Sequence, residues 1–159
     1  MEVLPDSSTI IALAKTGSLD LLKETFNTIC ITKEVKGEIT SGSFPEIEEI
    51  KRWIGKWITV IESRTTRYEE FEGLGDGEKS ILNYAKGRKN VLAILDEAEA
   101  RALAEEEGIL YTGTIGPIVF AFEKGKISKE RAIEIVKRLA KSDFRMTVEL
   151  YDWALEKLK

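Results

Sequence analysis

The stretch from Leu74 to Gly116 reads LGDGEKSILNYAKGRKNVLAILDEAEARALAEEEGILYTGTIG, and it contains the pattern that decides the fold. Within it, an apolar run from Val91 to Leu95 ends at Asp96 and leads into an Ala-rich helical segment. Such a run is typical of a buried parallel strand that delivers a side chain to the edge of a sheet. Ligands of open α/β sheets bind at those carboxyl ends, so Asp96 is a candidate site residue.

The same stretch opens with a helix that brings in a second acid. Gly75-Asp76-Gly77 precedes the helix, and we expect Asp76 to be its N-cap. The spacing of the apolar residues places Glu78 on the inward face of the first turn. Further on, Gly108 ends the Ala-rich helix, and residues 108–111 are expected to form another strand.

The turn after that strand, Thr112 to Gly116, consists mainly of small residues and leads into a helix with Pro117 in its first turn. Small residues at a helix start leave backbone N–H groups open to an anion, which suits a phosphate. An ordinary tight strand-to-helix turn explains the same residues. Both interpretations of Thr112, Gly113 and Thr114 stay open at this point.

Two more acids follow the first two expected strands, Val3–Pro5 and Thr28–Thr32. Asp6 lies between the first strand and a helix, where it is either a helix cap or a residue at the sheet's edge. Glu38 shares a helical face with Val35 and Ile39, where a carboxylate is costly unless it is paired or bound to metal. That helix could also simply leave Glu38 at its edge.

The alternation of strands and helices predicts one α/β domain over residues 1–159. Its expected fold has three layers, α/β/α, with a central parallel sheet of about five strands. The remaining strand is expected from Trp57 to Ile61, and a polar loop near the active edge from 62 to 77. Residues 128–159 are expected to add a helical extension of two helices, separated at Ser142–Phe144.

Composition excludes several classes of site. The chain has one cysteine and no histidine, which rules out an internal disulfide framework, a Cys- or His-based zinc site and a His-dependent nucleophile. The net charge of -4 means that any nucleic acid must bind a local patch. We expect a cytoplasmic protein, because there is no signal segment and no run long enough to span a membrane.

The acids at positions 6, 38, 78 and 96 are all expected at one edge of the sheet. Without histidine or a compensating lysine they would repel one another unless a cation neutralised them. Ligation by oxygen alone favours Mg²⁺ or Mn²⁺, which organise phosphate and activate water for displacement.

Four segments together resemble the PIN-domain superfamily, most of all its prokaryotic toxin-type ribonucleases and related predicted nucleic-acid-binding proteins. The resemblance covers nearly the whole chain, and the order of the motifs is more specific than any one of them. The segments are DSSTIIALAKTGSLDLL, GLGDGEKSILNYA, LDEAEARALAEEEGILYTGTIGPIVFAFEKGKI and DFRMTVELYDWALEKL.

The resemblance implies a Mg²⁺- or Mn²⁺-dependent ribonuclease that cuts single-stranded RNA and acts as the toxin of a toxin–antitoxin pair. Asp6, Glu38, Glu78 and Asp96 match the family's acidic positions, with Asp6, Glu78, Asp96 and Glu97 as expected metal ligands. Ser8, Arg101, Thr112, Gly113 and Thr114 are the expected substrate contacts. Many members have Asp-Asp where this chain has Asp96-Glu97, and here threonine rather than an acid follows the last strand.

Two further expectations concern partners. A PIN-like module that binds RNA or a protein without cutting is the alternative to a nuclease. The C-terminal helix from Met146 carries two apolar stripes, which indicate either a homodimer or antitoxin surface, or a helix wedged within the domain. The basic residues considered as RNA contacts, besides the preferred Arg101, are Arg64, Arg67, Lys79, Arg88 and Lys89.

Overall fold

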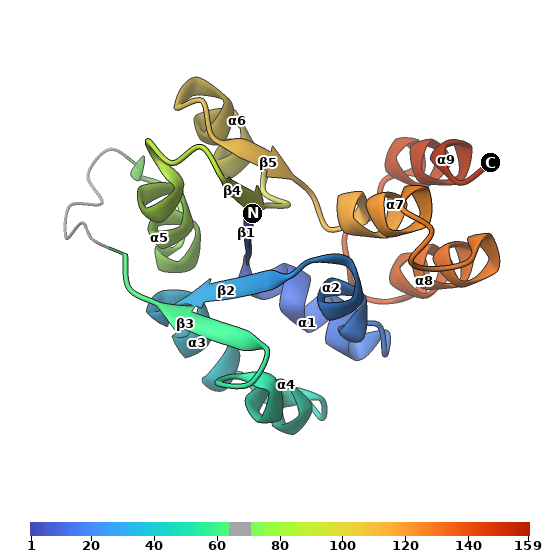
Figure 1. Cartoon of the computed structure of the whole chain (residues 1–159), viewed down its shortest axis with the longest axis horizontal. Coiled ribbons are helices and arrows are strands. Elements are labelled where there is room, and N and C mark those ends of the chain that lie inside the picture. Colours follow the sequence, from blue (N-terminus) through green and yellow to red (C-terminus); the bar gives the residue numbers. More distant parts are fainter. Residues whose placement is uncertain (64–70) are drawn as a thin grey trace.

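A five-stranded parallel sheet forms the centre of the computed structural model, which describes residues 1–63 and 71–159 (Figure 1). The strand order is β3-β2-β1-β4-β5, and every neighbouring pair is parallel. All the carboxyl ends therefore meet along one edge of the sheet, which we call the carboxyl edge. The strands are β1 (Glu2–Pro5), β2 (Thr28–Thr32), β3 (Ile58–Ile61), β4 (Val91–Ile94) and β5 (Leu110–Thr112).

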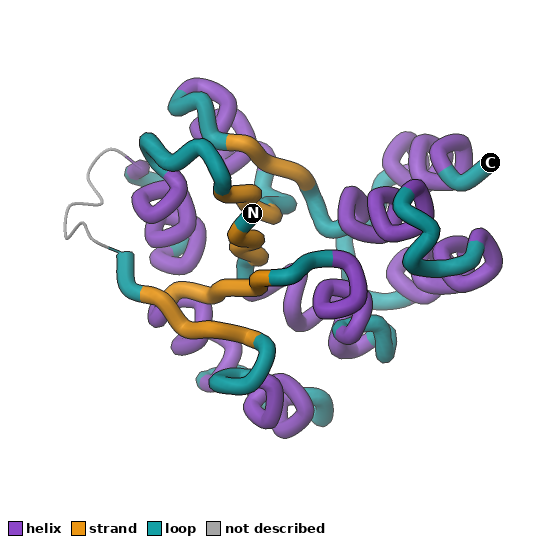
Figure 2. The backbone as a smooth tube through the Cα atoms, in the orientation of Figure 1, coloured by secondary structure: helices purple, strands orange, loops and turns teal. Residues whose placement is uncertain are grey.

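Helices flank the sheet and complete a three-layer α/β/α arrangement (Figures 1 and 2). The predicted fold class is thereby confirmed. The helices are α1 (Ser7–Lys15), α2 (Asp20–Thr25), α3 (Lys33–Thr40), α4 (Ile47–Trp53), α5 (Asp76–Ala85), α6 (Ala98–Glu106), α7 (Ile115–Glu123), α8 (Lys129–Lys141) and α9 (Val148–Lys157).

The hydrophobic core has two parts. The larger cluster surrounds the sheet and includes Val3, Leu4 and Ile94. The second cluster joins α7, α8 and α9 to one side of α1 and α2 through Ala12 and Leu21. Figure 1 shows the three C-terminal helices together at one end of the molecule, next to these two helices. The C-terminal segment is thus attached to the domain through α2 and through α1, the helix that begins at the carboxyl edge.

Two helix starts differ from what the sequence suggests. A serine at position 18, before the helical segment that follows Gly17, would be expected to cap α2, but its hydroxyl donates to the Thr16 carbonyl at 3.2 Å and no side chain that the structure describes caps this helix. Asp76 is the first residue of α5 and not its cap, because the cap is Gly75. The connection between α8 and α9 is also longer than expected and spans 142–147.

No helix within residues 1–63 and 71–159 is both long and apolar enough to cross a membrane. Of the expected loop from 62 to 77, residues 64–70 with Arg64 and Arg67 lie outside the described residues, and the loop ends earlier than expected because α5 begins at Asp76.

Candidate active site

Asp6 and Asp96 form a close pair at the carboxyl edge, and we call them the aspartate pair. They follow β1 and β4, which are neighbours in the sheet. The backbone N–H of Asp96 donates to Asp6 Oδ2 at 3.3 Å. The Ser8 hydroxyl lies 3.0 Å from Asp6 Oδ1 and 3.4 Å from Asp96 Oδ2, between the two side chains. Parallel pairing of the strands thus brings together two acids that are 90 residues apart in sequence.

Asp6 has a structural role as well as a place in the pair. Its Oδ1 accepts a hydrogen bond from the Thr9 backbone N–H at 2.8 Å and so caps α1. The side chain is only 3% exposed. Burial, and then the charge of Asp96, raise the pKa of Asp6 to about 6. The two interpretations of Asp6 from the sequence, cap and site residue, are therefore compatible.

The raised pKa of Asp6 predicts a pH dependence of stability. The folded chain holds the Asp6 proton more tightly than the unfolded chain, whose pKa is near 3.8. The resulting stabilisation is fully present below about pH 4 and is lost as the pH rises through about 6, by up to about 3 kcal/mol. In EDTA, Asp6→Asn should therefore gain stability relative to wild type between pH 4 and 7 in urea unfolding. Parallel stability curves for the two proteins would contradict this.

Thr114 holds Asp96 in place from the turn before α7. Its backbone N–H donates to Asp96 Oδ1 at 2.9 Å, and its hydroxyl donates to Oδ2 at 2.5 Å. The Thr9 hydroxyl, 2.8 Å from that of Thr114, then acts as the donor in their bond, because the Thr114 proton is already directed at the carboxylate. Thr114 is fully buried. Both of its donors are directed at Asp96, and the expected substrate contact of Thr114 stays a prediction.

Gly113 and Thr112, the other two expected substrate contacts of that turn, face in different directions. Gly113 lies against the site: a Cβ added there would be 3.2 Å from Asp96 Oδ1 and 3.8 Å from an Arg101 guanidinium nitrogen. Thr112 ends β5, and its side chain fills the space where a Cβ on Gly116 would lie. It lines a groove beside β5 and α7 rather than the aspartate pair. Gly113 is thus the turn residue that lies against both Asp96 and Arg101.

Glu38 reaches the carboxyl edge from α3. Val35 and Ile39 are buried on that helix, whereas Glu38 is exposed and stands at the edge of the apolar face. Its Oε2 accepts from the Ser7 hydroxyl at 2.6 Å, and its Oε1 accepts from the Gly77 backbone N–H at 2.8 Å. These contacts connect Glu38 to the first residue of α1 and to the start of α5.

Glu78 lies in the first turn of α5 and is half-buried. Its Oε2 accepts a hydrogen bond from the backbone N–H of Gly75, the N-cap residue, at 3.2 Å. Burial raises the pKa of Glu78, and the charges of Glu97 and Glu38 add to that effect. Buried hydroxyls fix the start of α5. The Ser80 hydroxyl donates to the Gly77 carbonyl at 2.6 Å and forms a second hydrogen bond, also of 2.6 Å, with the Thr32 hydroxyl.

The acids do not form one cluster. Among residues 1–63 and 71–159, no three acidic side chains converge into a preformed metal site. Mg²⁺ keeps several waters, however, and is commonly held by one or two carboxylates plus substrate phosphates. The aspartate pair supplies two such carboxylates, without an ion pair to any described lysine or arginine. The donor chemistry therefore fits a hard divalent cation at Asp6 and Asp96. Glu78 is influenced by the charge of Glu97, and the expected role of these two acids as metal ligands stays a prediction.

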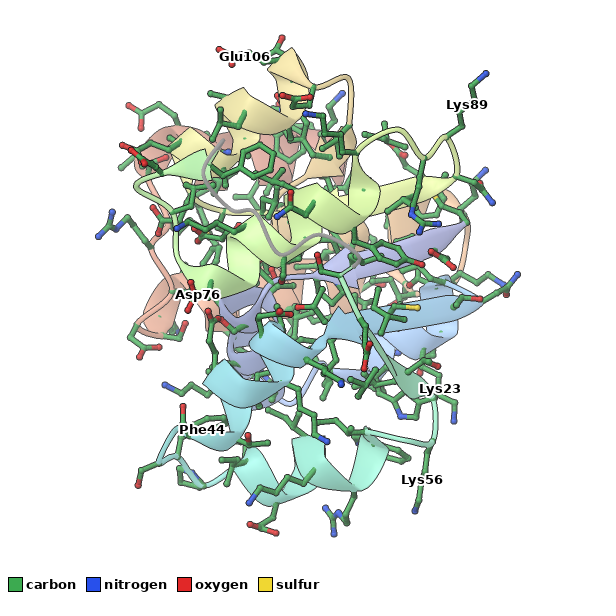
Figure 3. The ribbon with its side chains drawn as sticks, turned by 90° about the vertical axis from the view of Figure 1, so that its left-hand side faces the viewer. Lys23, Phe44, Lys56, Asp76, Lys89 and Glu106 are labelled. Atoms are coloured by element: carbon green, nitrogen blue, oxygen red, sulfur yellow. The ribbon has the colours of Figure 1, made fainter. Side chains whose placement is uncertain are left out.

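The basic residues separate by position. Arg101 lines a groove together with Ser8 and Asp96. Arg88 and Lys89 precede β4 at the amino edge of the sheet, and the Arg88 guanidinium lies 4.2 Å from the centre of the Tyr84 ring. Figure 3 shows Lys89 on the side of the molecule opposite Asp76. Arg88 and Lys89 are therefore not at the site.

The sequence did not single out Ser7, Thr9 or Gly77, which hold the acids through hydroxyl and backbone groups. The sequence did contain a signal for such supporting residues, namely a small or hydroxylated residue close to an acid, as with Ser7 after Asp6 and Gly77 before Glu78. Lys15 and Arg145, which line the groove beside Asp96, were also missed, because no local pattern connects α1 with the connection between α8 and α9.

Comparison with known proteins agrees with this arrangement. No curated protein and no solved structure matches the chain. A family model described as a PIN domain matches residues 2–159. That match includes every element of the sheet and all the acids described above. The chain therefore belongs to the PIN-domain family.

Proposed function

We propose that the protein is a Mg²⁺- or Mn²⁺-dependent endoribonuclease that hydrolyses phosphodiester bonds of single-stranded RNA. The aspartate pair is the observation that carries the proposal: two carboxylates share one edge of a parallel sheet, and one of them is buried with a raised pKa. Membership of the PIN-domain family supports it, since this is a nuclease-type fold that generally uses divalent metal ions.

A divalent cation at this site would polarise a phosphate and supply an activated water. The chain's own residues provide the framework for that chemistry. Asp6 and Asp96 supply the carboxylates that would hold the ion, and Thr114 fixes the orientation of Asp96. Glu38 is held toward the same edge by Ser7 and Gly77, where it would orient water or substrate. Arg101 supplies a cation for a phosphate next to the pair.

The direct test is incubation of the purified protein with a labelled RNA pool in Mn²⁺ and in EDTA. Cleavage that occurs with Mn²⁺ and stops with EDTA supports the nuclease. Retention of RNA without cleavage under both conditions supports the binding module instead and overturns the proposal.

We also propose that the enzyme acts as the toxin of a toxin–antitoxin pair, on the basis of the resemblance noted above. Induced expression of the wild-type chain should then arrest cell growth, whereas Asp96→Asn at the same level should not. Equal growth with both chains would overturn the toxin role and leave the nuclease to be judged by the RNA assay.

Arg101→Ala should weaken RNA binding and reduce its dependence on salt. Each phosphate contact that is lost on a single strand lowers the slope of log affinity against log salt by about 0.7. Fluorescence anisotropy over a salt series in EDTA measures this slope. Lys89→Ala is a matched control, since it removes one positive charge at the amino edge. An unchanged slope for Arg101→Ala would remove this residue from the interface.

An apolar surface beside β5 is the proposed site for a second copy of the chain. β5 is an edge strand, and a groove of about 400 Å³ lies next to it. Leu110 is 53% exposed and Trp153 44%, and Phe120 and Met1 lie in the same lining. The groove also has Glu123 and Lys157 in its lining, so a copy related by a two-fold axis can place opposite charges together.

Trp153→Glu should shift the protein toward monomer in light scattering, because it puts a charge into that apolar surface. The helix should stay folded, because Ala154 and Leu158 provide its buried contacts. If wild type is already monomeric, the homodimer is wrong. Binding of a small antitoxin at this surface would then appear as complex formation that Trp153→Glu abolishes.

A further inference from the structure

A groove of about 650 Å³ leads away from the aspartate pair along α1. One wall is a single face of that helix, formed by Ser8, Ile11, Ala12 and Lys15 at spacings of three and four residues. The segment between α8 and α9, with Phe144 and Arg145, and the start of α6, with Arg101, also line the groove. From Ser8 to Lys15 the helix extends for about 10 Å, so the groove connects the acids to a distant cation.

The positive charge continues beyond Lys15. A second hollow joins Lys15 to Arg138 and Lys141, and a third runs along α8 past Lys137. We call Arg101, Arg145, Lys15, Lys141 and Lys137 the basic track. Of these, Lys15 pairs with Asp143 at 3.1 Å, whereas the other four make no ion pair with any residue that the structure describes.

The track also contains acids. Asp143 pairs with Lys15 and Glu134 pairs with Arg138 at 2.5 Å, so neither adds an unpaired negative charge. Asp96 and Glu97 line the groove beside Arg101, and Glu130 lines the hollow along α8, so the excess of positive charge lies at Arg145, Lys141 and Lys137. The chain as a whole carries a net charge of -4, so this concentration of cations is local. Lys15 and Lys141 also suit the C-terminal turns of their helices, where a cation complements the helix dipole. That explanation does not extend to Arg145, which lies in a loop.

We propose that the basic track carries the backbone of a single-stranded nucleic acid away from the aspartate pair, over α1 toward the end of α8. The inference rests on the proposed function in one respect, namely that the nucleic acid is cleaved where one of its ends meets the aspartate pair. A single strand is favoured over a duplex because the groove is walled by helices and places the partly exposed Phe144 ring where an unpaired base can stack.

The test uses fluorescein-labelled single-stranded RNA and DNA of the same sequence, about 4 to 16 nucleotides long. Anisotropy in EDTA measures binding without cleavage. The variant is Lys141→Glu with Arg145→Glu, and both side chains are exposed. The control is Lys56→Glu with Lys89→Glu, the same change of charge at sites opposite Asp76 in Figure 3. Thermal unfolding of each variant checks its fold.

The track variant should bind on the order of 10-fold more weakly than the control, because hydrogen bonds to charged groups are lost. Its salt slope should fall by about 1.4, which corresponds to two phosphates on a single strand. Such a loss with RNA, or with RNA and DNA alike, supports the track. Equal affinity of the track variant and the control overturns it.

These outcomes are separate from those of the proposed function. Absence of cleavage with Mn²⁺ in the wild-type chain would overturn the nuclease, but a selective loss of binding in the track variant would still support the track. Metal-dependent cleavage by a track variant that binds as tightly as the control would leave the nuclease standing and remove the track.

Discussion

Asp96→Asn should reduce the rate of RNA cleavage by on the order of 100-fold or more while the chain stays folded. Groups that only orient a metal ligand contribute about 10- to 100-fold, so a direct ligand should contribute at least the upper end of that range. The Asn side chain keeps an oxygen that can accept from the Thr114 backbone N–H, which now donates to Asp96 at 2.9 Å. It loses one negative charge, and with it the hold on a divalent cation.

Initial rates with limiting Mn²⁺ measure the loss, and thermal unfolding checks the fold. Asp76→Asn is the matched control, because Asp76 is an exposed acid at the start of α5 and is not a member of the aspartate pair. It should cleave at close to the wild-type rate. Wild-type cleavage by Asp96→Asn at limiting metal would falsify the assignment of the aspartate pair.

Gly77→Ala should reduce cleavage by on the order of 10-fold or more without reducing stability. A Cβ at position 77 would lie 2.6 to 2.9 Å from the carboxyl group of Glu38, which must then move. Movement of a catalytic side chain by about 1 Å can lower a rate by about 100-fold. The fold should tolerate the change, since the displaced group is the end of a flexible side chain and alanine favours a helix over glycine by about 1 kcal/mol.

Gly37→Ala is the control for this change. Gly37 lies in α3, next to Glu38 in sequence, and a Cβ there meets nothing within 4 Å. Both variants should unfold at or above the wild-type temperature, while only Gly77→Ala should lose activity. If Gly77→Ala cleaves as fast as Gly37→Ala, the position of Glu38 does not matter for the reaction.

The sequence was sufficient for the sheet because its strands are short apolar runs with strong boundaries. Val91 to Leu95 and Thr28 to Thr32 are each followed by a polar residue that starts a helix or a turn, and the structure places β4 and β2 there within one residue. Parallel strands then had to bring Asp6 and Asp96 to the same edge. These two residues could be predicted because backbone topology alone decides where they lie.

The other site residues depend on side-chain direction, which the sequence pattern does not contain. Thr114 was expected to face a substrate phosphate because small residues open a helix, but its donors turn inward to Asp96. Glu38 was expected either on the apolar face of its helix or at the edge of that face, and the pattern could not decide between them; it lies at the exposed edge, where it accepts from Ser7 and Gly77. Lys15 and Arg145 share a groove only because the C-terminal helices pack on α1, a contact between distant segments that spacing cannot reveal.

Asp6 both caps α1 and belongs to the aspartate pair, and this combination affects which residues descendants of this protein would lose first. Selection for folding alone would keep Asp, Asn or Ser at position 6, because each of these can cap α1. The Glu38 carboxylate also accepts a backbone N–H from a helix, that of Gly77 in α5, but Glu38 is exposed whereas Asp6 is buried, so water can replace the bond that Glu38 makes. In descendants that no longer need to cleave RNA, residue 38 should therefore be substituted earlier than residue 6. A capping residue at position 6, whether Asp, Asn or Ser, beside a replaced Glu38 would mark a descendant that no longer cleaves RNA.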